Sequence, residues 1–218
     1  MTPKATIVEI TTIIRKLVEA SLSDQQNWPA LVSSGGVDEI CIPGDPPLNV
    51  AMKNIPYKDI YDAMEVGNAF HIRMLDGAFI QMCYRFSSNQ IASHRLCMFP
   101  APELASFDSD PDIYERDEIY ADIIGKNIVH FPVRFDFDAD AARHIDVRHP
   151  KSHLTLGQYP NCRIPLSAPL SPARFISFIL RNFYHNAFYS AGLDSINCAY
   201  SFPDTISANE RRISHLVG

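Results

Sequence analysis

Apolar residues recur at helical spacing near the N-terminus and again in the C-terminal third of the chain. The pair Thr2-Pro3 is typical of a helix start, because an N-cap side chain precedes a proline in the first turn. Ser171-Pro172 repeats that signal. Each start is followed by an apolar stripe that a helix would bury, formed by Ile7, Ile10, Ile14, Leu17 and Leu22 in the first case and by Phe175, Ile176, Ile179, Leu180 and Phe183 in the second. The pattern predicts helices that end by about residues 23 and 189, and shorter helices at 57–66 and 207–216.

Between the two long helices the pattern changes to alternation of apolar and polar residues, which is typical of half-buried strands. Residues 70–74 and 79–86 alternate on either side of Asp76-Gly77, and 91–99 form a third strand of the same meander. An Asp-Gly pair between such runs predicts a hairpin with a type I′ turn, because both central residues of that turn need positive φ. Further strands are expected at 39–42, 130–138 and 153–157.

Helices at both ends with antiparallel strands between them predict an α+β fold, in which a β-meander sheet is packed by an N-terminal helix and by a helix in the C-terminal half. The length favours a single domain over residues 1–218. No apolar run approaches the roughly 20 residues that cross a bilayer, and the N-terminus lacks the features of a signal peptide. The five cysteines are scattered without a C-x-x-C pair. Reduced thiols, a cytoplasmic location and no membrane partner are therefore expected.

Charge is distributed unevenly around a formal net charge of −6. The segment 102–122 holds eight acids and one base, whereas 143–185 holds six arginines and lysines, a single acid (Asp146) and four histidines. An acidic chain with one basic block can still attract a polyanion, because the local field and not the total charge steers a ligand. The alternative is that both segments are solvated surface without a partner.

The basic block is preceded by a strand with two carboxylates, and together they suggest chemistry on a phosphodiester. Asp136 and Asp138 alternate with Phe135 and Phe137, so both project from one face, about 6–7 Å apart. That spacing suits Mg²⁺ or Mn²⁺, with His149 or His153 completing the coordination sphere. Such a metal would activate water for attack on phosphorus, so one hypothesis is a metal-dependent nuclease.

Two other interpretations use the same residues without a metal. In the first, His149 and His153 act as general base and general acid while Arg163 and Arg181 hold the phosphate; this requires the ribose 2′-hydroxyl as nucleophile and predicts RNA as substrate. In the second, the residues are structural, with Arg134 paired to a strand aspartate. Motifs of P-loop NTPases, Rossmann dehydrogenases, α/β-hydrolases and zincins are absent from the sequence, which argues against those classes.

The same block resembles an uncharacterised bacterial family known as domain of unknown function 2290. The resemblance is carried by the R-F-D-F-D strand from Arg134, the H-P-K-S-H-L run from His149, Gly157, the C-R-I-P run from Cys162, and the F-I-L-R-N-F-Y run from Phe178. It implies no assigned activity. Some relatives are encoded beside a helicase in loci that protect bacteria against phage, which implies a helicase-like partner.

The sequence therefore leads to the hypothesis of an antiphage effector subunit that acts on nucleic acid, as a phosphodiesterase or nuclease working with a helicase-like partner. In the nuclease version Asp136, Asp138, His149 and His153 are catalytic, and phosphate is held by Arg134, Arg163, Arg181, Asn182 and His185. The alternative is a non-catalytic adaptor subunit that binds nucleic acid or docks the helicase through the basic block. The acidic segment would contact a basic partner or shield the basic groove.

Overall fold

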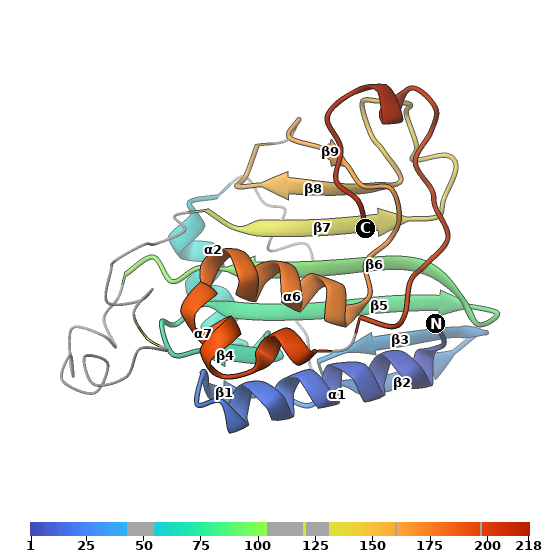
Figure 1. Ribbon diagram of the computed structural model, residues 1–218. Helices are drawn as coiled ribbons and strands as arrows, with labels where there is room; N and C mark the ends of the chain where they lie inside the picture. The colour runs from blue at the N-terminus through green and yellow to red at the C-terminus, as the bar shows by residue number, and fades with distance from the viewer. Residues whose placement is uncertain (43–54, 104–119, 121–130, 160, 197) are drawn as a thin grey trace.

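The computed structural model describes residues 1–42, 55–103, 120, 131–159, 161–196 and 198–218. Within them, nine strands form one antiparallel sheet (Figure 1). Seven strands follow one another across it: β1 (Ser23–Gln26), β4 (Ile72–Met74), β5 (Phe79–Ser87), β6 (Gln90–Phe99), β7 (Val133–Asp138), β8 (Ser152–Leu156) and β9 (Ile164–Pro165). The hairpin of β2 (Ala30–Ser34) and β3 (Val37–Cys41) joins the same edge of β5 as β4 does, further along the strand.

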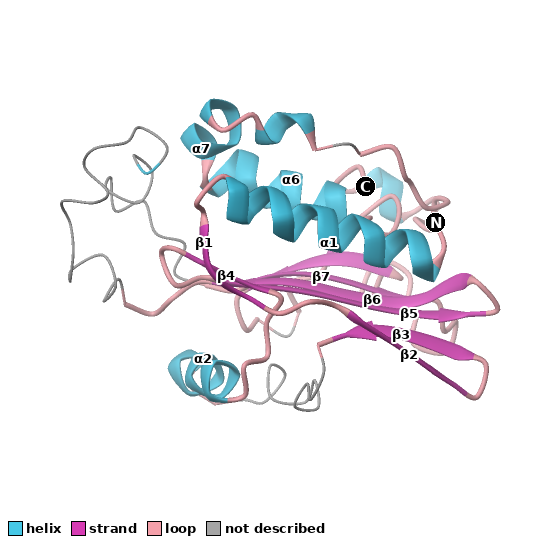
Figure 2. Cartoon of the chain, turned by 90° about the horizontal axis from the view of Figure 1, so that it is seen from below, coloured by secondary structure: helices cyan, strands magenta, loops and turns pink. Residues whose placement is uncertain are grey.

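Helices lie on both faces of this sheet, but unequally (Figure 2). The helices α1 (Pro3–Glu19), α6 (Pro172–Phe183) and α7 (His185–Ser190) lie on one face, and α2 (Tyr57–Val66) lies on the other. The two predicted N-caps are present, since the backbone N–H groups of Ala5 and Arg174 donate to the Thr2 and Ser171 hydroxyls. Two short 3₁₀ turns, η2 (Leu193–Ser195) and η3 (Glu210–Arg212), follow in the C-terminal segment.

The main hydrophobic core fills the space between the sheet and the face of α1 and α6. Alternate residues of β5, from Ile80 to Phe86, and of β7, from Val133 to Phe137, are buried there or at its margin, as the alternation in the sequence predicts. A smaller cluster lies under α2 on the opposite face, built around Tyr61, Phe70 and Phe79. The α+β architecture is thus confirmed. Beyond the reach of α2, the second face of the sheet carries charged side chains.

The hairpin at Asp76-Gly77 is confirmed, but its type I′ turn is wrong. Gly77 has φ of +83°, whereas Asp76 is not among the residues with positive φ. The strands instead connect through a longer turn in which the Ala78 N–H donates to the Asp76 carboxylate at 3.0 Å. The hydrogen bond to the Asp76 side chain stabilises this turn, so the turn does not need a second residue with positive φ.

The first C-terminal helix prediction has the right extent but is divided into α6 and α7, whereas the second was too long. The long helix breaks at Tyr184, which is buried and whose hydroxyl donates to Asp76 at 2.8 Å. The expected helix at 207–216 is reduced to η3, although the capping box forms between Ser207 and Glu210. Its last residues instead pair with the segment after β9, through the backbone of Leu216.

The strands β1, β2 and β9 were not predicted, because β1 and β2 expose nearly every residue and β9 has only two. The acidic segment 102–122 lies outside the described residues apart from positions 102, 103 and 120. In the described part of the chain no helix has the length and apolar character needed to cross a membrane.

Candidate functional site

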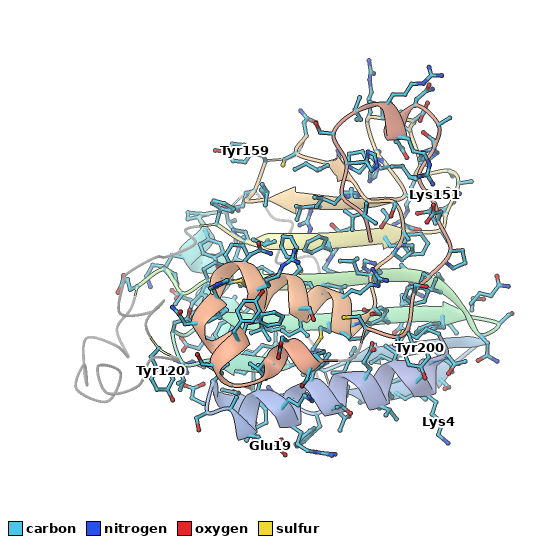
Figure 3. All side chains as sticks on the ribbon, viewed as in Figure 1. Lys4, Glu19, Tyr120, Lys151, Tyr159 and Tyr200 are labelled. Atoms are coloured by element: carbon cyan, nitrogen blue, oxygen red, sulfur yellow. The ribbon has the colours of Figure 1, made fainter. Side chains whose placement is uncertain are left out.

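A pocket of about 460 Å³ opens on the sheet face opposite α1 and α6. Strands β3, β5, β6, β7 and β8 contribute to it, as do the loops that flank β8. Lys151, the residue before β8, is labelled in Figure 3. Its charged lining has twice as many cations as acids, which creates a positive field. The cations are Arg85, Arg95, Arg134, Arg143, Lys151 and Arg163, the acids are Glu39, Asp136 and Asp138, and the histidines are His94, His144, His149 and His153.

Strand register places three of these side chains in one row across the sheet. Arg95 of β6 pairs with Asp136 of β7, and Asp136 pairs with His153 of β8. Because successive strand residues point to opposite faces, the buried Phe135 and Phe137 hold β7 in the core while the residues between them face the pocket. The alternation of β7 therefore sets the chemistry of this face.

Asp136 is the carboxylate at the centre of that row. Its Oδ2 lies 2.6 Å from Arg134 Nε and its Oδ1 lies 3.1 Å from Arg95 Nε. Burial by itself would raise the pKa of Asp136, but the charges of Arg134 and Arg95 outweigh it and hold the pKa below its ordinary value. The group is therefore an ionised anchor for two guanidinium groups. Since a guanidinium has five N–H donors, Arg134 retains donors beyond its bond to Asp136.

His153 is 5% exposed and lies between the backbone and Asp136. Its Nδ1 is 3.0 Å from the Pro150 carbonyl oxygen, so Nδ1 carries the hydrogen, because a carbonyl can only accept. Its Nε2 is then 3.9 Å from Asp136 Oδ2. Burial lowers the pKa of His153, although the charge of Asp136 opposes the shift. The ring is consequently neutral at pH 7, with Nε2 as an acceptor.

His149 forms the second half of a histidine pair. The centroid of its ring lies 5.4 Å from that of His153, with the rings edge to face. Burial, followed by the positive charge of Arg163, lowers the pKa of His149. Two neutral imidazoles thus lie beside each other in a pocket whose field attracts anions. A bound phosphate would favour protonation of either ring.

The two strand aspartates share a face as predicted, but both are engaged by arginine. Asp138 Oδ2 lies 2.8 Å from Arg143 Nη1, and its Oδ1 accepts from the Asp140 N–H at 3.0 Å. A cation shared by Asp136 and Asp138 would have to displace charged donors from both. The arrangement does not favour the Mg²⁺ or Mn²⁺ site, which stays a prediction.

Three of the predicted phosphate ligands are separated from the rest by the sheet. Arg181 and Asn182 belong to α6 and His185 to α7, on the opposite face from the pocket (Figure 2). Asn182 and His185 contact carbonyl groups of their own helical segment, at Phe178 and Arg181. Arg163, by contrast, lines the pocket with Arg134. The apolar stripe of α6 packs into the main hydrophobic core. That packing keeps α6 on the face of the sheet opposite the pocket.

The contribution of β5 and β6 to the pocket was not predicted from the sequence. Arg95 and Arg85 line the pocket from β6 and β5. A signal for Arg85 is present in the sequence, because the alternation of residues 79–86 places it on the opposite face from Phe86. The position of Arg95 follows only from the register between β6 and β7, which brings it to Asp136, 41 positions away in the sequence.

The C-terminal segment also reaches the rim of the pocket. Glu210 is fully buried and lies 3.1 Å from His144 Nε2. In the described part of the chain, His144, Asp146 and Glu210 could each offer one ligand atom to a metal ion, with these atoms within 4.8 Å of one another. Protein donors already serve both carboxylates, including Ser207 and Asn209. These contacts hold the loop 143–149 against the C-terminal segment.

Comparison with known proteins adds a family and no activity. A family model described as "Uncharacterized conserved protein (DUF2290)" matches residues 22–217. That range includes all nine described strands and the whole pocket lining. No curated protein and no solved structure matches the chain.

Proposed function

The chain belongs to this family of uncharacterised conserved proteins, and from the geometry of its pocket we propose that it binds nucleic acid through phosphate and cleaves RNA without a metal ion. The observation that carries the proposal is the pair of His149 and His153 beside a cation-rich pocket. Imidazole is the side chain whose ordinary pKa lies nearest neutrality, and the negative charge of a bound phosphate would oppose the lowering of both pKa values.

The proposed reaction assigns a separate role to each group. His149, the more exposed ring, takes the proton of the ribose 2′-hydroxyl, whose oxygen attacks the adjacent phosphorus. His153 gives a proton to the 5′-oxygen that leaves, and Asp136 favours its protonated form. Arg163 and Arg134 stabilise the charge that develops on the phosphoryl oxygens. The products are a 2′,3′-cyclic phosphate and a 5′-hydroxyl end.

A non-catalytic binding role is the second candidate, and the burial of His153 favours it. A ring that is 5% exposed and held by Pro150 can serve to orient Asp136 rather than to transfer protons. The cations of the pocket would then bind phosphate without cleaving it. For either role, the family resemblance leads us to propose an effector or adaptor subunit in antiphage defence, acting with a helicase-like partner.

The test is cleavage of labelled RNA, single-stranded DNA and duplex DNA, with Mg²⁺, Mn²⁺ or EDTA, in the presence and absence of any helicase-like protein encoded beside its gene. We expect EDTA-resistant cleavage of RNA alone, reduced about 10²–10⁴-fold by His149→Ala or His153→Ala. His185→Ala is the matched control, because that histidine belongs to α7, which lies on the opposite face of the sheet.

Each other outcome selects a different function. RNA binding without cleavage, lost in Arg163→Ala and weakened by salt, would support the adaptor. Cleavage that needs a metal and is lost in Asp136→Asn would support the metal-dependent nuclease. Absence of binding to every substrate would contradict the proposal.

A further inference from the structure

A second cavity, of about 620 Å³, lies on the other face of the sheet. Its lining comes from α6, α7, the segment after η2 and the C-terminal residues. Much of that lining is apolar, with Phe135 of β7, Phe178 of α6 and Phe188 of α7 among its residues. The volume falls in the range of about 300–1,000 Å³ that is typical of small-molecule sites.

The polar part of this cavity comes from one flank of α6. Arg174, Ser177 and Arg181 are spaced by three and then four residues, so they follow one line along the helix. Asp194 is the one acidic side chain in the lining. In the described part of the chain, neither Arg174 nor Arg181 forms an ion pair with an aspartate or glutamate.

Arg174 lines the cavity, and its guanidinium has N–H donors beyond the one that the protein uses. Its Nη1 donates to the main-chain oxygen of Gly218 at 3.0 Å. Its Nε is buried and has no hydrogen-bond partner. A buried donor without an acceptor is costly. Since a guanidinium has five N–H donors, Arg174 retains others for an acceptor bound in the cavity that it lines.

We propose that this cavity binds a small organic anion with a flat apolar body. The body packs against the phenylalanine side chains, and the anionic group is held by Arg181 and Arg174, whose planar guanidinium groups suit carboxylate, phosphate or sulfonate oxygens. This site does not depend on the proposed RNA cleavage.

The two sites share a strand without sharing a side chain. Phe135 lines the helix-side cavity, whereas its neighbours Arg134 and Asp136 line the sheet-face pocket. Variants of α6 can therefore test the cavity while the sheet-face pocket stays intact. Arg163→Met provides the reverse change, since Arg163 lines only the other site.

The experiment is a fluorescence titration of the full chain with two dyes that share an aromatic body. The first is 8-anilinonaphthalene-1-sulfonate, and the second is N-phenyl-1-naphthylamine, which lacks the sulfonate. We expect Arg181→Met to weaken binding of the anionic dye in this cavity about tenfold while the neutral dye binds unchanged. Arg163→Met should leave both affinities unchanged.

A cavity-filling variant, Ser177→Leu, should weaken both dyes. Thermal unfolding of each variant checks that no loosened state binds the dye non-specifically. Failure of the folded wild-type chain to bind the anionic dye would overturn the proposal, as would equal affinity in Arg181→Met or an equal loss in Arg163→Met. Because no nucleic acid is present, these outcomes leave the cleavage proposal unaffected.

Discussion

Asp136 shows how a single buried charge organises the sheet-face pocket. Its side chain is 17% exposed, as is that of Arg95, and Arg134 is 20% exposed. Two cations this close would repel each other without the carboxylate between them. The aspartate therefore determines where their remaining donors lie, even if it never contacts a substrate.

Asp136→Asn should lower the free energy of unfolding by about 3 kcal/mol at pH 7, because it leaves two partly buried guanidinium groups without their counter-charge. Asp138→Asn is the control, since Arg143 is mostly exposed and such pairs contribute below about 1 kcal/mol. Urea unfolding measures both. Equal losses in the two variants would contradict the structural role of Asp136.

The elements themselves follow local rules, with exceptions where the chain turns. The capped starts of α1 and α6 and the inward residues of β5 and β7 were all predictable, because N-caps and alternation depend on neighbours in sequence. The turn before β5 was predicted in position and not in type. There Gly77 supports a contact that sequence does not reveal: its carbonyl accepts from the Tyr61 hydroxyl.

Gly77→Ala should cost about 3 kcal/mol of stability. Its φ of +83° strains any side chain, and a Cβ there would lie 3.0 Å from Ala101 Cβ and 3.2 Å from the Tyr61 hydroxyl oxygen. Gly192→Ala isolates the backbone part, because Gly192 has φ of +66° with open space around it, and should cost about 1 kcal/mol. Thermal unfolding of both variants gives the difference; no excess loss in Gly77→Ala would show that the turn relaxes.

At the scale of the whole molecule, two buried histidines tie stability to pH. Burial lowers the pKa of His71 to about 3 and that of His94 to about 4. Both therefore stay neutral in the folded chain while the unfolded chain binds a proton near the ordinary value of 6.5. Stability from this source is present above about pH 6.5 and falls as pH drops toward the folded-state pKa.

His94→Gln should remove part of that acid sensitivity. Relative to wild type, the loss of unfolding free energy below pH 6.5 should become smaller by about 1.4 kcal/mol per pH unit, which corresponds to one proton. Glu9, whose pKa is raised to about 7 by burial, opposes the trend equally in both proteins and cancels. Urea unfolding between pH 7 and about 5 measures the difference. Parallel curves would contradict the assignment.

The sequence by itself determined the α+β class, the two capped helices and the faces of the central strands, because periodicity and capping are local properties. Only the tertiary structure decided which charges meet. Register joined Arg95 to Asp136 across 41 residues, and the apolar stripe of α6 placed Arg181 in a different site from Arg163. A sheet has two faces, and a one-dimensional block of basic residues does not reveal on which face each one lies.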